Sequence, residues 1–161
     1  MDKKLCSAFN EQINNELYSA YLYLAMAAYF EYENLEGFAQ WMKVQAKEEV
    51  NHAMKMFEFL NDRGQRVILG AVHKPPADFS SPRDVFERTL KHEKKITSLI
   101  NNLYDLSIKV KDNSSSVFLQ WYISEQVEEE KSASSILEKL KMIKPSSGSM
   151  IMLDRELAKR E

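Results

Sequence analysis

The sequence predicts an all-α protein, a four-helix bundle with one long crossover between its second and third helices and a short C-terminal fifth helix. All four glycines and all four prolines fall at residue 37, between residues 64 and 82, or between residues 145 and 148. Since both residue types are disfavoured inside helices, the long intervals between them are the expected helices. Apolar residues recur at helical spacing there, and each long interval carries a glutamate within its apolar stripe.

The first two helices are separated by a short turn that Asn34 and Gly37 punctuate. The first is expected from about residue 5 to residue 33, with a buried stripe of Phe9, Ile13, Leu17, Ala20, Leu24 and Ala27. The second continues to about Asp62, where Gly64 ends it. Its stripe contains Phe38, Met42, Ala46, Ala53, Met56 and Leu60.

Residues 63–81 form the long crossover. About 19 extended residues reach up to about 63 Å, whereas a second helix of about 27 residues is roughly 40 Å long. The crossover can therefore span the bundle and return the third helix parallel to the second, which is the bundle topology with one crossover.

The third helix is expected to begin at Ser81 and Pro82, a cap followed by a proline, and Asp84 favours its first turn. It ends near Asp112 and Asn113, and its stripe is Phe86, Leu90, Ile96, Ile100 and Leu103. The fourth helix ends before Pro145 and has a stripe of Phe118, Tyr122, Ala133, Ile136 and Leu140. Residues 146–149 are expected to form a flexible joint before a fifth helix at about 150–159.

Composition indicates one soluble domain over residues 1–161, with the bundle at about 5–144. The chain is 44% hydrophobic and has a formal net charge of -2, so it has no basic field to hold nucleic acid or anionic lipid. It contains no apolar run of membrane-spanning or signal-peptide length, and we expect a cytoplasmic protein. Cys6, the only cysteine, cannot form an internal disulfide and is interpreted as a small, half-buried residue.

Five residues on the stripes predict a metal site. In each stripe a glutamate follows an apolar stripe residue by seven positions, and His52 lies one turn after the glutamate of the second helix, giving Glu16, Glu49, His52, Glu93 and Glu129. Buried carboxylates are costly unless they are paired or bind metal. With the helices running up, down, down and up, the glutamates lie between roughly 17 and 28 Å from one end, Glu93 being the highest. Carboxylates with one imidazole suit two divalent ions, and non-haem iron is the expected redox metal.

The chain resembles the ferritins over essentially its whole length. The resemblance rests on Glu16 and Tyr23, on Lys91-His92-Glu93, on Trp121, and on the runs at 48–52 (Glu-Glu-Val-Asn-His) and 125–129 (Glu-Gln-Val-Glu-Glu). It implies a ferroxidase centre in which one iron binds Glu16, Glu49 and His52. A second iron would bind Glu49, Glu93 and Glu129, with Glu49 as the bridge and Gln126 donating a hydrogen bond nearby.

The resemblance also implies a third iron position, as in bacterial non-haem ferritins, at Glu48, Glu125, Glu128 and Glu129. Glu48, Glu125 and Glu128 are equally well interpreted as a solvated face. Gln126 takes the place of a second Glu-x-x-His motif, which argues against bacterioferritins and rubrerythrins. Val50 and the lack of a distinctive axial methionine argue against haem.

As a ferritin, the protein would oxidise Fe²⁺ with dioxygen or peroxide and store the ferric mineral inside a hollow shell of twenty-four subunits. Tyr23 is either a redox-active or hydrogen-bonding neighbour of the irons or a packed core residue. Trp121 is expected in the core, the alternative being an aromatic residue near the irons that quenches stray oxidising equivalents. His73 and His92 are expected to be exposed, and neither is assigned to metal.

Three other functions remain open on the sequence alone. The chain could be a dimeric di-iron oxidase or peroxidase that stores nothing, or a metal-free structural bundle. A DNA-sheathing mini-ferritin is disfavoured, because those proteins build their sites between subunits and often add basic tails.

Overall fold

A computed structural model describes residues 1–144 and 148–161. The described residues form five helices: α1 (Lys3–Tyr32), α2 (Glu36–Asp62), α3 (Pro82–Lys109), α4 (Asn113–Met142) and α5 (Ser149–Leu157). These helices confirm the predicted fold class. Part of the joint predicted at 146–149 lies outside the described residues, and the described part begins again at Gly148, directly before α5.

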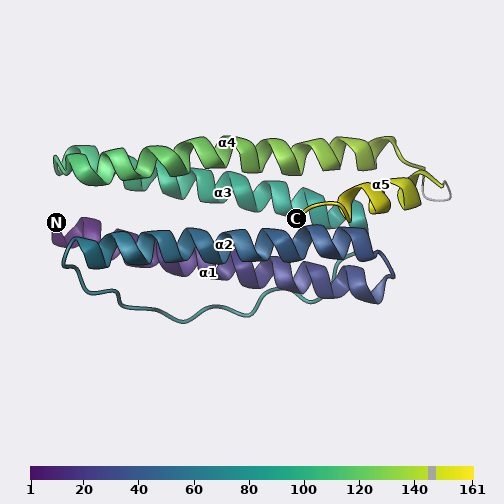
Figure 1. Cartoon of the computed structure of the whole chain (residues 1–161), viewed down its shortest axis with the longest axis horizontal. Helices are drawn as coiled ribbons and strands as arrows, with labels where there is room; N and C mark the ends of the chain where they lie inside the picture. The colour runs from purple at the N-terminus through teal and green to yellow at the C-terminus, as the bar shows by residue number, and fades with distance from the viewer. Residues whose placement is uncertain (145–147) are drawn as a thin grey trace.

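The four long helices lie side by side with the predicted directions (Figure 1). α1 and α2 are antiparallel neighbours, as are α3 and α4. The segment between α2 and α3 runs the full length of the bundle along α1, so α3 starts at the same end as α2 and runs parallel to it. This connection brings the middles of all four helices to one level.

Side-chain caps fix three of the helix starts. Asp2 accepts from the backbone N–H of Lys4 at 2.8 Å at the start of α1, and Ser81 accepts from Asp84 at 3.1 Å at the start of α3. Asp112 caps α4 and also receives two hydrogen bonds from the Arg63 guanidinium, at 2.9 and 3.0 Å. These bonds hold the pKa of Asp112 at about 2. They tie the end of α2 to the turn between α3 and α4.

The crossover is held on α1 by two asparagines one helical turn apart. The side-chain oxygen of Asn10 accepts from the backbone N–H of Ile68 at 2.7 Å, and the Asn14 amide donates to the Ala71 carbonyl at 3.0 Å. Near its end the crossover buries Phe79, which packs 5.5 Å from the Tyr29 ring. The extended segment therefore gains backbone partners that it lacks within itself.

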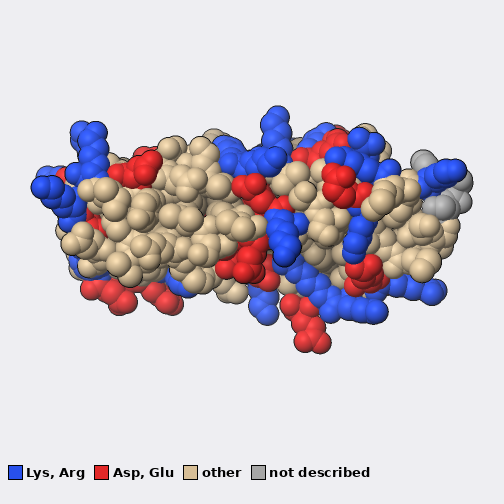
Figure 2. Space-filling model, turned by 90° about the horizontal axis from the view of Figure 1, so that it is seen from above, with Lys and Arg blue, Asp and Glu red and all other residues tan. Residues whose placement is uncertain are grey.

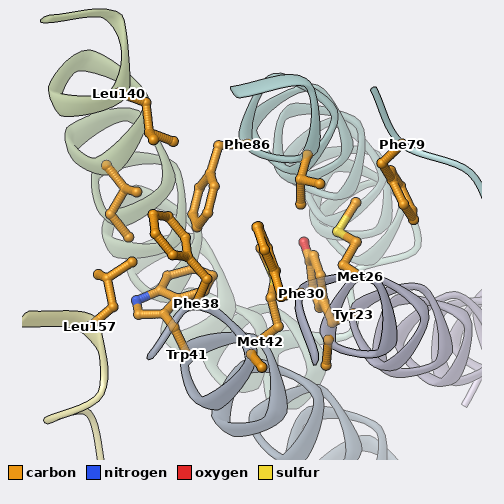
Figure 3. Packing of buried hydrophobic residues seen from close by; sticks show 14 of the residues in the cluster. Tyr23, Met26, Phe30, Phe38, Trp41, Met42, Phe79, Phe86, Leu140 and Leu157 are labelled. Atoms are coloured by element: carbon orange, nitrogen blue, oxygen red, sulfur yellow. The ribbon is translucent and has the colours of Figure 1, made fainter. Parts of the chain in front are cut away.

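Two apolar clusters fill the two ends of the bundle. The cluster at the α5 end contains aromatic side chains from three helices, and Phe38 lies 5.0 Å from Phe30 and 6.0 Å from Phe86 between ring centroids (Figure 3). The cluster at the far end is built from Leu5, Phe9, Ile13, Ala53, Met56, Leu60, Ile96, Ile100, Leu103, Leu119 and Tyr122. Between the clusters lies a polar waist, which contains the predicted site residues.

The surface carries charges of both signs. In Figure 2, Lys and Arg alternate with Asp and Glu over the middle and right of the face shown, whereas much of the left part is uncharged. No helix within the described ranges is both long and apolar enough to cross a membrane.

Leu24 and Gly37 do not lie where the sequence pattern placed them. Leu24 lies on the outer side of α1 and is 50% exposed, because the stripe shifts to Tyr23, Met26 and Ala27 along this long helix. Gly37 is not in the turn but in the first turn of α2. Asn34 alone adopts the left-handed conformation there, with φ 59°.

The role of Gly37 is to let α5 approach α2. The N-cap residue of α2 makes no side-chain cap, and Asp154 of α5 takes over this function by accepting from the backbone N–H of Phe38 at 3.0 Å. A Cβ on Gly37 would lie 1.7 Å from the Asp154 carbonyl oxygen. Leu153 and Leu157 then bury their side chains in the α5-end cluster.

We predict that Gly37→Ala displaces α5 from α2. The added methyl group overlaps a backbone atom, so α5 must shift and lose the Asp154 cap, at a cost of about 1–3 kcal/mol. Thermal unfolding and limited proteolysis of α5 measure the effect. Gly70→Ala is the matched control, because its Cβ would meet Asn14 at an ordinary 3.5 Å. Equal behaviour of the two variants would contradict this role for Gly37.

Candidate metal centre

Four glutamates, one from each long helix, are buried in the waist. Each is at most 6% exposed, and together they are called the waist carboxylates: Glu16, Glu49, Glu93 and Glu129. On every helix the waist carboxylate lies between residues of the far-end cluster and residues of the α5-end cluster. Glu93 thus shares the level of the others, because the apolar residues before and after it on α3 belong to opposite clusters.

Glu16, Glu49 and His52 converge on one point. Each offers a ligand atom, and these three atoms all lie within 4.8 Å of one another. His52 Nδ1 lies 3.5 Å from Glu49 Oε2, as expected for residues three apart on one helix face. Within the described part of the chain, Glu16 Oε2 is buried and has no hydrogen-bond partner. An orphaned carboxylate oxygen facing other carboxylates is the arrangement that a cation satisfies.

Two glutamines that sequence reasoning missed donate to the waist carboxylates. Gln12 Nε2 donates to Glu16 Oε1 at 2.8 Å. Gln45 Nε2 donates to Glu129 Oε2 at 2.7 Å and to Glu49 Oε1 at 3.2 Å, so it links α2 to α4. Each glutamine precedes a waist carboxylate on its own helix by four residues, and this spacing was the signal available in the sequence.

Glu93 is held by two of the predicted neighbours. The Tyr23 hydroxyl donates a short hydrogen bond to Glu93 Oε1, and Gln126 Nε2 donates to Glu93 Oε2 at 3.1 Å. Tyr23 is fully buried, so it is both a core residue and a hydrogen-bonding neighbour of the waist. With two donors fixing its carboxylate, Glu93 is oriented before any cation arrives.

A second group of ligand atoms lies beside the first. His52, Glu125 and Glu129 also offer atoms within 4.8 Å of one another, with Glu125 half-buried and 3.9 Å from His52 Nε2. Of the other two residues predicted for a third iron, Glu128 is exposed, and Glu48 is half-buried in an ion pair with Arg160.

Burial and mutual repulsion hold the waist carboxylates towards their neutral forms. Burial, followed by the charge of Glu49, raises the pKa of Glu16 well above its ordinary value. Burial and the charge of Glu93 raise the pKa of Glu49 and bring the pKa of Glu129 to about 7. The pKa of Glu93 is raised mainly by burial, although Tyr23 and Gln126 oppose the shift. Without cations, the waist therefore keeps protons at neutral pH.

Two aromatic residues near the site lie in unexpected places. Trp121, expected in the core, is 37% exposed. Its ring packs edge-on against the His52 ring on the outer side of the site, and the Lys55 ammonium lies 3.3 Å from the Trp121 ring centroid. His92, expected to be exposed, is half-buried, and its Nε2 shares a 2.7 Å hydrogen bond with Ser19 Oγ. Burial lowers the pKa of His92 to about 4. His73 is exposed, as predicted.

The waist fits a pair of divalent cations. Four carboxylates and one imidazole provide a negatively charged, oxygen-rich donor set of the kind that iron and similar hard or borderline metals prefer. Two divalent ions would neutralise four carboxylates, and one would satisfy the orphaned Glu16 oxygen. Cations would also displace the protons that Glu16 and Glu49 retain because their pKa values are raised.

We predict that Zn²⁺ binding to the metal-free protein strengthens as pH rises through 7 and releases protons. Glu129 has a pKa of about 7, so below that pH a cation must displace a proton that it need not displace above it. The Glu129 proton alone makes the affinity at pH 6 about tenfold weaker than at pH 7.5, and protons displaced from Glu16 and Glu49 add to this dependence. Calorimetry in buffers of different ionisation enthalpy measures both quantities.

Glu129→Gln should release fewer protons, because an amide has none to lose. Glu58→Gln, on the exposed side of α2, is the control and should leave proton release unchanged. Zn²⁺ affinity that does not vary between pH 6 and 7.5 would contradict the protonated waist.

Comparison with known proteins agrees with this geometry. A family model described as a ferritin-like domain matches residues 6–143. A probable bacterial non-heme ferritin-like protein of Haemophilus influenzae is 39% identical over 157 residues, covering 98% of this chain and 95% of the relative. A bacterial non-heme ferritin of Staphylococcus saprophyticus is 39% identical over 160 residues, covering 99% of this chain and 96% of the relative.

A solved structure is also very similar. The open-pore ferritin of the hyperthermophilic archaeon Archaeoglobus fulgidus has a TM-score of 0.99 and 48% identity, covering 100% of this chain and 99% of that one. Together with the buried carboxylates at matching helix levels, the family model and the near-full-length relatives show that the chain belongs to the ferritin family.

Proposed function

We propose that this protein oxidises Fe²⁺ to Fe³⁺ at a di-iron centre in the waist and stores the ferric product inside an oligomeric shell. The observation that carries the proposal is the burial of four carboxylates in the waist, one from each long helix, with the ligand atoms of Glu16, Glu49 and His52 close together and one carboxylate oxygen unpartnered. Membership of the ferritin family supports iron as the metal. The chain acts as one domain, since α5 is built into the same bundle.

The ligands proposed for the first iron are Glu16, Glu49 and His52, whose ligand atoms already lie together. Glu49, Glu93 and Glu129 are proposed for the second iron, with Glu49 as the shared ligand. Gln45 supports this arrangement, because its amide already holds Glu49 and Glu129 in a common orientation. Hydrogen bonds that fix a carboxylate reduce the reorganisation needed when a cation binds.

The proposed oxidation transfers one electron from each of two Fe²⁺ substrates to dioxygen or hydrogen peroxide. Two electrons and two protons reduce dioxygen to hydrogen peroxide or hydrogen peroxide to water, so a two-iron site meets the electron requirement in one event. The protein positions the two ions and leaves coordination positions free for the oxidant. Tyr23, whose hydroxyl donates to Glu93 Oε1, is proposed to hold that ligand in position.

Glu125 and Glu129, with His52, offer a proposed exit position for iron. Glu125 is half-buried, so this position connects the closed waist to the surface. Glu48 is half-buried and Glu128 is exposed, and these two carboxylates are proposed to continue the path from this position towards solvent. A chain of carboxylates of increasing exposure suits the transfer of a hard cation from the site to a mineral surface.

We predict that Glu49→Gln and His52→Ala slow rapid iron oxidation by at least about 100-fold, because each removes a ligand from the proposed first iron. Stopped-flow absorbance of the ferric product measures the rate. Glu49→Gln should remain folded, because a neutral amide of similar size replaces a carboxyl that the waist already holds towards its neutral form.

Glu58→Gln is the matched control, because it removes a carboxylate from the exposed face of the same helix. It should oxidise iron at the wild-type rate. Wild-type rates in both waist variants would exclude the proposed site.

We predict an assembly of about 450 kDa, twenty-four times the chain mass of 18.7 kDa. Storage needs a cavity, and one bundle packed with side chains has none large enough to hold a mineral. Light scattering coupled to size-exclusion chromatography measures the mass. A dimer that oxidises iron but holds no mineral would instead indicate a small di-iron oxidase.

A further inference from the structure

The C-terminal residues after α5 return along α2 towards the metal centre. The Gln40 amide donates to the Arg160 backbone carbonyl at 3.3 Å, which anchors the chain end on α2. The Arg160 guanidinium then lies over the Trp41 ring, with its central carbon 4.3 Å from the ring centroid. Its Nη1 donates to the Trp41 carbonyl at 3.4 Å, and its Nη2 donates to Glu48 Oε2.

These contacts fix both the backbone and the side chain of Arg160 in one place on α2. The backbone carbonyl, the planar face of the guanidinium and two of its nitrogens all have partners on α2. Stacking on an aromatic ring and hydrogen bonding by a planar fork are the two interactions that distinguish arginine from lysine. Burial of Leu153 and Leu157, together with the Asp154 cap, holds α5 so that Arg160 reaches this place.

Glu48 connects this contact to the metal centre. It precedes His52 by four residues on α2, so the two side chains lie one turn apart on the same face of that helix. His52 is one of the three residues that offer ligand atoms at the outer position, with Glu125 and Glu129, so Glu48 lies one helical turn from that position. The Arg160 cation occupies a Glu48 oxygen that would otherwise be free for a metal ion.

We propose that Arg160 is a positioning residue that withholds Glu48 from the outer cation position and so sets the affinity of that position. The inference rests on the proposed function, because it concerns the exit position beside the di-iron centre. A cation that binds there must compete with the guanidinium for Glu48. The two inner positions fill first, and the outer position fills only at higher cation concentration.

Competition of this kind favours release of iron from the outer position. With Glu48 engaged by Arg160, the outer cation has fewer carboxylate ligands and dissociates more readily. α5 thereby links the C-terminal end of the chain to the movement of iron out of the waist.

Equilibrium calorimetry with Zn²⁺ on the metal-free assembled protein tests the proposal without any redox step. Arg160→Gln should leave the two strongest Zn²⁺ sites per chain unchanged and tighten the weaker one by about two- to fivefold, the range expected for a half-exposed ion pair. Arg160→Lys keeps the charge but loses the planar fork, so it should give a smaller increase.

Arg155→Gln is the matched control, because it removes the same charge from an exposed position on α5. It should leave all Zn²⁺ sites unchanged. In a Glu48→Gln background, Arg160→Gln should have no further effect. Ending the chain after Lys159 removes Arg160 without any substitution in α5, and it should tighten the weaker site as Arg160→Gln does.

The possible outcomes separate this proposal from the proposed function. The role of Arg160 is wrong if the two strong Zn²⁺ sites are present but Arg160→Gln and the truncation do not tighten Zn²⁺ binding at the weaker site. It is also wrong if their effect on that affinity equals the effect of Arg155→Gln. The di-iron centre stands in both cases. If the wild-type protein lacks the two strong sites, both proposals fail.

Discussion

The central physical constraint on this structure is the repulsion among four carboxylates that lie at one level of the bundle. An apolar cluster on either side shields them from water. In such surroundings charges interact strongly, and bulk salt screens them poorly. Protons or cations must therefore accompany the waist carboxylates. Because their pKa values are raised, Glu16 and Glu49 retain protons when no cation is bound. Binding of a cation such as iron is the alternative to these protons. The protein gives up stability at its centre to keep a site ready for metal.

The rest of the fold keeps these carboxylates in place. The long crossover makes α2 and α3 parallel, so each helix passes through the waist between the same two clusters. Gln45 and Tyr23 then orient individual carboxylates by hydrogen bonds across helices. At the α5 end, Gly37 lets the last helix dock on α2, and this docking brings Arg160 into contact with Glu48. Packing at the ends of the bundle thus determines the geometry at its centre.

Most of the fold was predictable from sequence, because glycines and prolines mark the helix limits and the apolar period marks the buried faces. The level of Glu93 was the least certain, since small errors in helix limits shift a residue by several ångströms along the axis. The hydrogen-bond partners of individual side chains were harder to predict than the positions of residues along the helices. Gln12 and Gln45 look like ordinary polar residues until their carboxylates are known to be buried, and the Arg160 contact with Glu48 joins residues 112 positions apart. Trp121 and His92 were misplaced because the edge of a stripe does not show which side chains a neighbouring helix covers.

The most direct test of this account is anomalous diffraction at the iron edge from crystals of the assembled protein loaded with Fe²⁺ without oxygen. The account predicts two iron peaks per chain in the waist, within ligand distance of Glu16, Glu49, His52, Glu93 and Glu129. A waist without iron, in which these carboxylates hydrogen bond to one another or turn towards solvent, would contradict it.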